Sequence, residues 1–320
     1  MAGQTRVLGA ALLVLAFIPF FIQDDYLYHL LIMAGIYAAL TMSLNLLLGC
    51  AGMFSLGHAA FYGLGAYFAA LMALRHDFPF LLTVLGSGLF AGVIGALVAF
   101  PALRMKGIFL AIGTMGFNEI FRILAINLED LTGGPAGLPG IPAPEIFGYV
   151  LQGPRDFYLL IILVCLVTCR AFSGILRANP GRALIAIKDD EIAAKAVGIN
   201  LTFYKVVAFG VSAAVAGMSG GLFAYYMTYI SPDNFVLAES FSILAMVALG
   251  GIGNLPGSIV GAVALVVIPE AFRFLQDYRL FIYGVTIILT IRLLPGGILS
   301  RLPSLKRFTR KKSGHAVSGF

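Results

Sequence analysis

The chain has 320 residues, of which 60% are hydrophobic and only 11% are charged, and its mean hydropathy is +0.97. Apolar runs of about 18 residues recur along it, which excludes an ordinary soluble domain. The formal net charge of +6 does not indicate nucleic-acid binding, because the basic residues stand beside apolar runs and in the C-terminal tail, where membrane proteins keep them. The three cysteines lie at or in apolar segments without clustered metal ligands, so we expect no metal and no cofactor.

The apolar runs predict an all-α, polytopic bundle of transmembrane helices. Each run is long enough to cross a hydrocarbon core of about 30 Å. Because that core offers the backbone no water, helices are the expected spans. The first run is expected to be a retained span, since no small-residue cleavage site follows it. The predicted segments are residues 7–22, 28–48, 53–74, 80–100, 107–128, 157–173, 203–230, 240–268 and 278–294.

Charge predicts the topology. With the N-terminus inside, alternation of the spans places the acidic loop 129–156 outside and the basic loop 174–202 inside. The basic tail 301–320 also belongs inside, which requires 240–268 to enter the membrane and return on the same side. Its centre, Leu249–Ser258, contains four glycines and one proline, as a broken element would need.

We therefore expect about eight full spans, one re-entrant helical hairpin and two cytoplasmic termini. The alternative is a single kinked helix at 240–268 with a span miscounted elsewhere. Residues 1–300 would form one transmembrane domain, followed by a basic, disordered cytoplasmic tail at 301–320. The loop 129–156 is dense in glycine and proline and cannot form a long helix.

The loop 174–202 carries a cluster of charges that is unusual for this chain. Asn179 and Pro180 are suited to start a short helix, since asparagine can cap and proline fits the first helical position. Asp189 or Asp190 can cap a second helix that ends near Gly198. Two more signals complete the segment: a cap at Asn200 or Thr202 for the next span, and a face of small residues at Ala193, Ala194 and Ala196. A compact, charged helical loop predicts a soluble partner.

The second half of this loop, Glu191–Gly198, resembles the coupling loop of ABC importer permeases, which docks into a groove of the ATPase subunit. Further stretches are similar to the branched-chain amino acid permeases: Leu44–Ala66, Thr132–Pro142, Gly181–Ala194 and Leu249–Gly257. On these motifs the chain is identified as a member of that family, as the longer of its two paired permease subunits. Two departures from the family pattern are Met53, where glutamine is common, and the absence of the Leu-Pro ending of the wider coupling motif.

The resemblance implies a subunit of an importer in a bacterial inner membrane. It implies as partners a second permease subunit, two ATP-binding subunits and an extracytoplasmic substrate-binding protein, besides membrane lipid, with no nucleic acid. Substrate affinity would reside mainly in the binding protein, and ATP hydrolysis on the separate subunits. The residues that it assigns to ATPase coupling are Arg182, Asp190, Glu191, Ala193, Ala194 and Gly198.

Polar residues inside spans are costly and usually face the bundle interior or a water-filled path. Two interpretations of His58 remain open: it lines the path, or it donates to a backbone carbonyl in a glycine-rich kink. Glu119 and Arg122 are three residues apart on one helix, which favours a structural or gating ion pair. The candidates for lining the path are Asn45, Ser55, His58, Thr114, Asn118 and Glu119.

Other functions are disfavoured by what the sequence lacks. It has no G-x-x-x-x-G-K-[ST] motif to hold ATP phosphates, and no clustered catalytic set for an intramembrane enzyme. An ion-coupled secondary transporter would use intramembrane carboxylates, but Glu119 has Arg122 beside it. We therefore expect a transport subunit that is not an enzyme. Within the ABC class, a permease for urea, other amino acids, sugars or another small solute remains the alternative, because no residue identifies the substrate.

Overall fold

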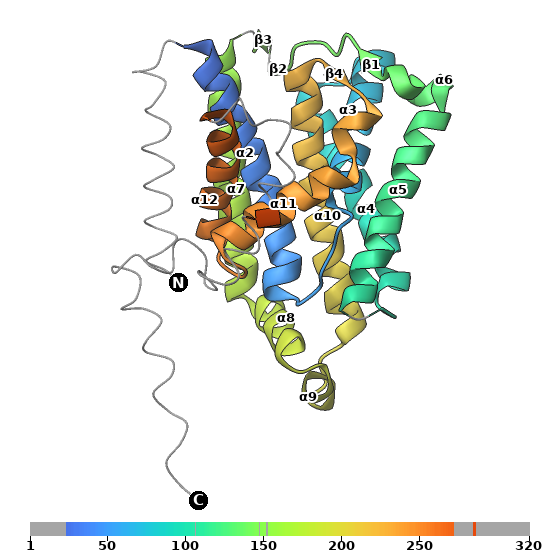
Figure 1. Ribbon diagram of the computed structural model, residues 1–320, viewed down its shortest axis with the longest axis vertical. Coiled ribbons are helices and arrows are strands. Elements are labelled where there is room, and N and C mark those ends of the chain that lie inside the picture. The colour runs from blue at the N-terminus through green and yellow to red at the C-terminus, as the bar shows by residue number, and fades with distance from the viewer. Residues whose placement is uncertain (1–23, 106, 147, 152, 272–283, 286–320) are drawn as a thin grey trace, which may run out of the picture.

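A computed structural model describes residues 24–105, 107–146, 148–151, 153–271 and 284–285. The predicted span 7–22 and the tail 301–320 lie outside the described residues, as does nearly all of 278–294. The described part is a helical bundle (Figure 1). Six of its helical segments are long and apolar enough to cross a membrane, by length and composition. The predicted class, a polytopic helical bundle, is confirmed, whereas the total number of spans stays a prediction.

The long helices follow one another in chain order. They are α2 (Asp25–Asn45), α3 (His58–His76), α4 (Phe80–Ala102), α5 (Ile108–Asn127), α7 (Pro154–Arg177), α10 (Leu201–Met227), α11 (Leu237–Gly250) and α12 (Leu255–Ala271). The shorter helical elements are η2 (Leu46–Cys50, a π-helix), α6 (Glu129–Thr132), η3 (Gly134–Ala136), α8 (Asn179–Asp189), α9 (Glu191–Ala196) and η4 (Pro232–Phe235).

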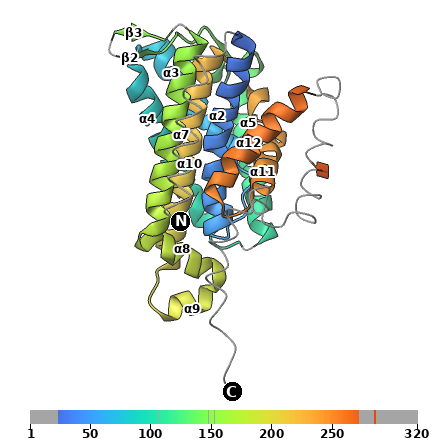
Figure 2. The same cartoon turned by 90° about the vertical axis from the view of Figure 1, so that its left-hand side faces the viewer.

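Two ends of the bundle differ in character. Helices α8 and α9 project from one end, which we call the coupling end (Figure 1). The opposite end, which we call the strand end, carries two antiparallel pairs of short strands (Figures 1 and 2). The pairs are β1 (Leu138–Pro139) with β4 (Tyr229–Ile230), and β2 (Glu145–Ile146) with β3 (Tyr149–Val150). Residues 129–146 and 148–151 thus form short elements only, as the glycines and prolines of this loop predict, and α7 begins at Pro154.

One predicted span starts too early. The segment expected at 53–74 becomes helical only at His58, and residues 51–57 are irregular. Gly52 has φ +69°, a left-handed conformation that ends the preceding helical run. Apart from the exposed Gly52 this segment is buried or half-buried, so its amides need side-chain partners. Thr114 Oγ1 accepts from the amide of Leu56 at 2.9 Å, and Ser55 Oγ accepts from the amide of Gly57 at 3.3 Å.

Small residues let α10 pack closely between α3 and α4. Small-residue faces of α4 and α10 meet here: a Cβ on Gly92 would lie 3.0 Å from Cβ of Ala214, and one on Gly221 would lie 2.7 Å from Oγ of Ser87. On the other side, a Cβ on Gly65 would overlap the backbone of Gly217. These faces therefore pack helices within the subunit.

The segment 240–268 is broken, as predicted. Helices α11 and α12 are separated by Gly251–Asn254, where Gly251 has φ +105° and Gly253 has φ +84°. Gly250 and Gly257 are in backbone contact, and α12 turns back beside α2 (Figure 1). A single continuous kinked helix is therefore excluded. The place of this hairpin in the bilayer stays a prediction.

The α3–α10 contact gives a stability prediction. Gly65→Ala would place a methyl group into the Gly217 backbone, so one helix must shift, and such overpacking typically costs 1–3 kcal/mol. Gly116→Ala on α5 is the matched control, because a Cβ there meets nothing within 4 Å. Thermal unfolding of both purified variants in detergent should show a lowered midpoint for Gly65→Ala only. Equal midpoints would contradict the tight packing.

Candidate coupling loop and transport path

The coupling loop begins with a tight corner between α7 and α8. A Cβ on Gly181 would overlap the backbone of Leu176, so only glycine lets α8 lie this close to the end of α7. The expected cap at Asn179 is wrong: Ala178 occupies the cap position, and Asn179 is already helical. The reason is a competing partner, since the Asn179 side chain accepts from the guanidinium of Arg182.

Helix α9 has well-formed caps at both ends. Asp190, and not Asp189, accepts from the amides of Ile192 at 2.8 Å and Ala193 at 3.1 Å. At the other end Gly198 has φ +84°, its amide donates to Lys195 O at 3.0 Å, and the next amide donates to Ala194 O at 3.1 Å. That pair of bonds is a Schellman motif, which favours glycine at this position.

Of the two caps expected for the next helix, α10, the structure has the one at Asn200. Asn200 Oδ1 accepts from the amide of Phe203 at 3.0 Å. The predicted signals at Asp190, Gly198 and Asn200 are therefore confirmed. Because all three act over a few residues of chain, the sequence alone was enough to find them.

The expected face of three alanines is only partly present. Ala193 and Ala196 are exposed, but Ala194 is buried against the bundle. Neighbouring residues on a helix point about 100° apart, and here that rotation turns Ala194 towards the bundle while Ala193 stays outside. Large apolar side chains stand exposed beside the two outward alanines. We call Ile192, Ala193, Ala196 and Val197 the α9 patch; Ile192 is 83% exposed and Val197 is 77% exposed.

Two lysines fix the loop to the bundle through contacts distant in sequence. Lys205 Nζ on α10 lies 2.7 Å from Glu191 Oε1, which ties α9 to α10. Lys188 Nζ on α8 donates to the carbonyl of Gly49 at 2.8 Å. Sequence reasoning missed both contacts, because no local signal marks a partner 14 or 139 residues away.

Among the path candidates, Asn45 lies at the α11–α12 break. Its Nδ2 donates to Ser258 Oγ at 2.7 Å, to Asn254 O at 3.2 Å and to Gly251 O at 3.3 Å. Its Oδ1 accepts from the amide of Gly253 at 2.7 Å. Asn45 therefore satisfies the backbone groups that the break leaves without helical partners.

His58 lies at the start of α3, in the centre of the subunit. Its Nε2 is 3.0 Å from Ser212 Oγ, which in turn donates to the carbonyl of Ser43 at 2.6 Å. The partner is thus a hydroxyl on α10 and not the backbone carbonyl considered from the sequence. Because the serine proton is committed to Ser43, Nε2 of His58 is the donor in this pair.

Asn118, Glu119 and Arg122 lie on α5 near η4. Asn118 Nδ2 donates to the carbonyl of Phe235 at 3.4 Å. The predicted pair is confirmed, with Arg122 Nη1 at 3.5 Å from Glu119 Oε1, and Arg122 Nη2 also lies 3.6 Å from Asp233 Oδ1. Both distances are longer than those of a close charge-assisted bond. The Glu119 side chain is 50% exposed and that of Asp233 is 79% exposed.

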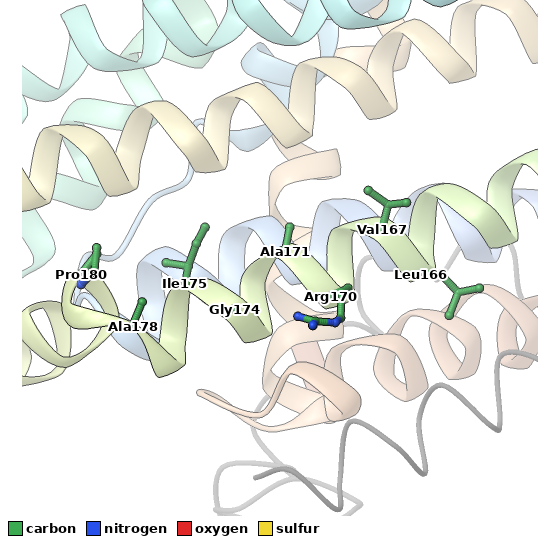
Figure 3. Close-up of a pocket in the computed structure, with 8 residues that line it drawn as sticks. All are labelled: Leu166, Val167, Arg170, Ala171, Gly174, Ile175, Ala178 and Pro180. Atoms are coloured by element: carbon green, nitrogen blue, oxygen red, sulfur yellow. The ribbon is translucent and has the colours of Figure 1, made fainter.

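An open groove runs along the outer side of α7 towards α8 (Figure 3). Its lining is apolar except for Arg170. None of the residues predicted to couple or to line the path contributes to it. One end of the groove, at Gly174, Ile175, Ala178 and Pro180, nevertheless belongs to the first part of the loop 174–202.

The fold and these features define a polytopic membrane protein with one projecting, capped helical loop. The chain belongs to the family described as branched-chain amino acid transport system / permease component, whose model matches residues 26–291. The resemblance seen in the sequence motifs is confirmed by this match.

Relatives agree with that assignment. The chain is 36% identical over 307 residues to the high-affinity branched-chain amino acid transport system permease protein LivM of Salmonella typhimurium, covering 89% of this chain and 72% of the relative. It is 35% identical over 327 residues to LivM of Escherichia coli, covering 95% and 77%. LivH of Salmonella typhimurium is 25% identical over 316 residues, covering 87% and 98%. No solved structure matches the chain.

The cap of α9 can be tested directly. Asp190→Ala removes the acceptor of two amides at the helix start, a loss that typically costs about 1 kcal/mol. We expect faster hydrogen exchange at Ile192 and Ala193 in the purified subunit. Asp189→Ala is the matched control, because the neighbouring carboxylate does not cap α9. Equal exchange in the two variants would show that Asp190 does not hold this helix.

Proposed function

We propose that this chain is a permease subunit of a bacterial ABC importer for branched-chain amino acids. It forms half of the translocation path and docks an ATP-binding subunit through the loop 174–202. The observation that carries the proposal is the α9 patch, at the tip of a projecting loop that is capped at both ends of its second helix. Large apolar side chains that stand out into water favour a protein partner.

The loop supports docking by being rigid as well as apolar. Asp190 and Gly198 fix the ends of α9, and Glu191 fixes its side through Lys205. A preorganised helix loses little conformational freedom on binding. Arg182 and Asp190 stand exposed beside it and are available for polar contacts at the rim.

The relatives support the remaining partners. LivM and LivH are both named as permease proteins of a branched-chain amino acid transport system, which favours two different permease subunits around one path. This chain lacks a phosphate-binding loop, so ATP hydrolysis would take place on two separate ATP-binding subunits. An extracytoplasmic binding protein would deliver substrate at the strand end. The subunit would lie in the inner membrane, with both termini and the coupling end on the cytoplasmic side.

Among the candidate path residues, only the one on the exposed face of α5 is accessible in the subunit, so this face would line the path. Glu119 stands on this face with Gly116, and charged groups inside a membrane normally face water or protein. The other candidates are at most 1% exposed in the subunit, so their role would be to hold the wall of the path: Asn45, Ser55, His58, Thr114 and Asn118. Arg122 and Asp233 would keep the Glu119 carboxylate in place near the strand end.

The α9 patch gives the test of this function. The full set of this chain, the second permease, the ATP-binding subunits and the binding protein is reconstituted in proteoliposomes. Ile192→Asp puts a charge into the patch, so we expect the ATP-binding subunits to be lost on purification and ATP-driven leucine uptake to fall at least about tenfold, equivalent to ~1.4 kcal/mol of docking energy. Val150→Asp, at an exposed apolar residue of the strand end, is the matched control for retention of the ATP-binding subunits only, because that end would receive the binding protein.

The outcomes separate the alternatives. Normal ATPase binding by Ile192→Asp would contradict docking through α9. Uptake of urea or another solute but not leucine by the wild-type set would keep the class and change the substrate. Leucine uptake driven by an ion gradient without the ATP-binding subunits would contradict the ABC assignment.

A further inference from the structure

Three segments far apart in the sequence meet just inside the coupling loop. They are Lys188 on α8, the π-helix η2 at the end of α2, and the break between α11 and α12. Lys188 Nζ donates to Gly49 O at 2.8 Å. The stem of the same side chain lies beside Gly52, where an added Cβ would be 3.1 Å from Lys188 Cγ.

The bond to Gly49 is chemically favourable. The last carbonyls of a helix have no partners within the helix and carry its partial negative charge. A lysine ammonium therefore both satisfies such an acceptor and interacts with the helix dipole. As a charge-assisted bond it is stronger than one between neutral groups. Lys188 is thus a firm link between α8 and the end of α2.

The next step runs from Gly49 to the break. A Cβ on Gly49 would overlap the backbone of Gly253 and the Oδ1 of Asn45. No side chain can therefore separate η2 from the α11–α12 break, and backbone touches backbone. Asn45, one turn earlier, bonds through its amide to three backbone groups of the break, including the Gly253 amide at 2.7 Å, and to Ser258 Oγ of α12 at 2.7 Å.

The middle of this chain of contacts is an element that can change its form. The hydrogen bonds of a π-helix span one residue more than those of an α-helix, and such turns are often found at functional sites. A return of this turn to α-helical bonding would rotate Gly49 and shift it along the helix axis. Because interiors are close-packed, such a shift moves the neighbouring backbone with it. Gly251 and Gly253, which have positive φ, give the break the freedom to follow.

We propose that Lys188 and Asn45 are positioning residues that transmit movement of the coupling loop to the α11–α12 break, through Gly49. This proposal rests on the proposed function, because it needs an ATP-binding subunit that moves α8. When α8 moves, Lys188 displaces the Gly49 carbonyl through their hydrogen bond, and η2 rearranges. Asn45 then moves the break through its own hydrogen bonds. The break then acts as the part of the path wall that responds to ATP.

The test uses the reconstituted complex and the number of leucine molecules taken up per ATP hydrolysed. Lys188→Met keeps the apolar stem over Gly52 but removes the donor. We expect the complex to assemble and hydrolyse ATP, while uptake per ATP falls about tenfold, which corresponds to ~1.4 kcal/mol of lost coupling. Lys188→Arg, which keeps a donor, should restore most of the ratio. Arg104→Met, at an exposed cation after α4 and outside the loop 174–202, is the control and should change little.

A double mutant shows whether the two residues act together. Asn45→Asp keeps the acceptor for Gly253 but loses the donor for Ser258 and the two carbonyls. If both residues serve one relay, Lys188→Met with Asn45→Asp should lower the ratio no further than the worse single variant. Independent, multiplicative losses would contradict a shared relay.

Hydrogen exchange is a second measurement, for variants that assemble too poorly for the uptake ratio to be determined. ATP should change hydrogen exchange at residues 251–254 in the wild-type complex, and this change should be lost in Lys188→Met while exchange in α9 still responds. A wild-type uptake ratio, or an unchanged ATP response at 251–254, would overturn the relay and leave the importer function standing. Absence of any ATP-binding subunit on the wild-type chain would instead overturn the proposed function.

Discussion

The structure depends on one constraint: a backbone polar group inside a membrane needs a partner within the protein. Helices meet this need by themselves, so most of the chain requires no special residue. The exceptions are the irregular segments 51–57 and 251–254, where the backbone leaves its helix; Gly52, Ile252 and Gly253 are exposed there, and the other residues are buried or half-buried. In these two segments side chains supply the missing hydrogen-bond partners of the backbone. Thr114 and Ser55 serve the first segment, and Asn45 serves the second.

Close packing by small residues makes these irregular segments possible. Glycine on α3 and α10 lets their backbones touch, which places His58 within reach of Ser212. Glycine at 49 likewise lets η2 touch the break between α11 and α12. The polar residues that the sequence singles out are therefore mostly partners of backbone or of each other. The exposed charged group on α5 is different, because Glu119 stands at a surface of the subunit.

Many of these features could be predicted from the sequence. Those that could not depend on contacts between residues far apart in the sequence. The helical class, the cap at Asp190, the helix end at Gly198 and the Glu119–Arg122 pair all follow from residues a few positions apart. The glycines of Leu249–Ser258 predicted the helix break. The partners of Lys188, Asn45 and His58 could not be predicted, because they lie on other helices.

Two local details also failed, for related reasons. Asn179 was expected to cap α8 but bonds to Arg182, since two possible partners compete within one turn. Ala194 was expected on the docking face but points inward, because the orientation of a short helix is set by what it packs against. The π-helix η2 has no sequence signal that we could recognise. The motifs in the sequence were enough to identify the family, but they do not indicate these contacts.

The central claim is that α9 meets an ATP-binding subunit, and a crosslink tests it most directly. A single cysteine replaces Val197 in a chain whose Cys50, Cys165 and Cys169 have been changed to alanine, and the complete transporter is assembled in vesicles. We predict a short-range crosslink from position 197 to an ATP-binding subunit, in a complex that still takes up leucine. Crosslinking to that subunit from position 150 at the strand end, with none from position 197, would contradict the account.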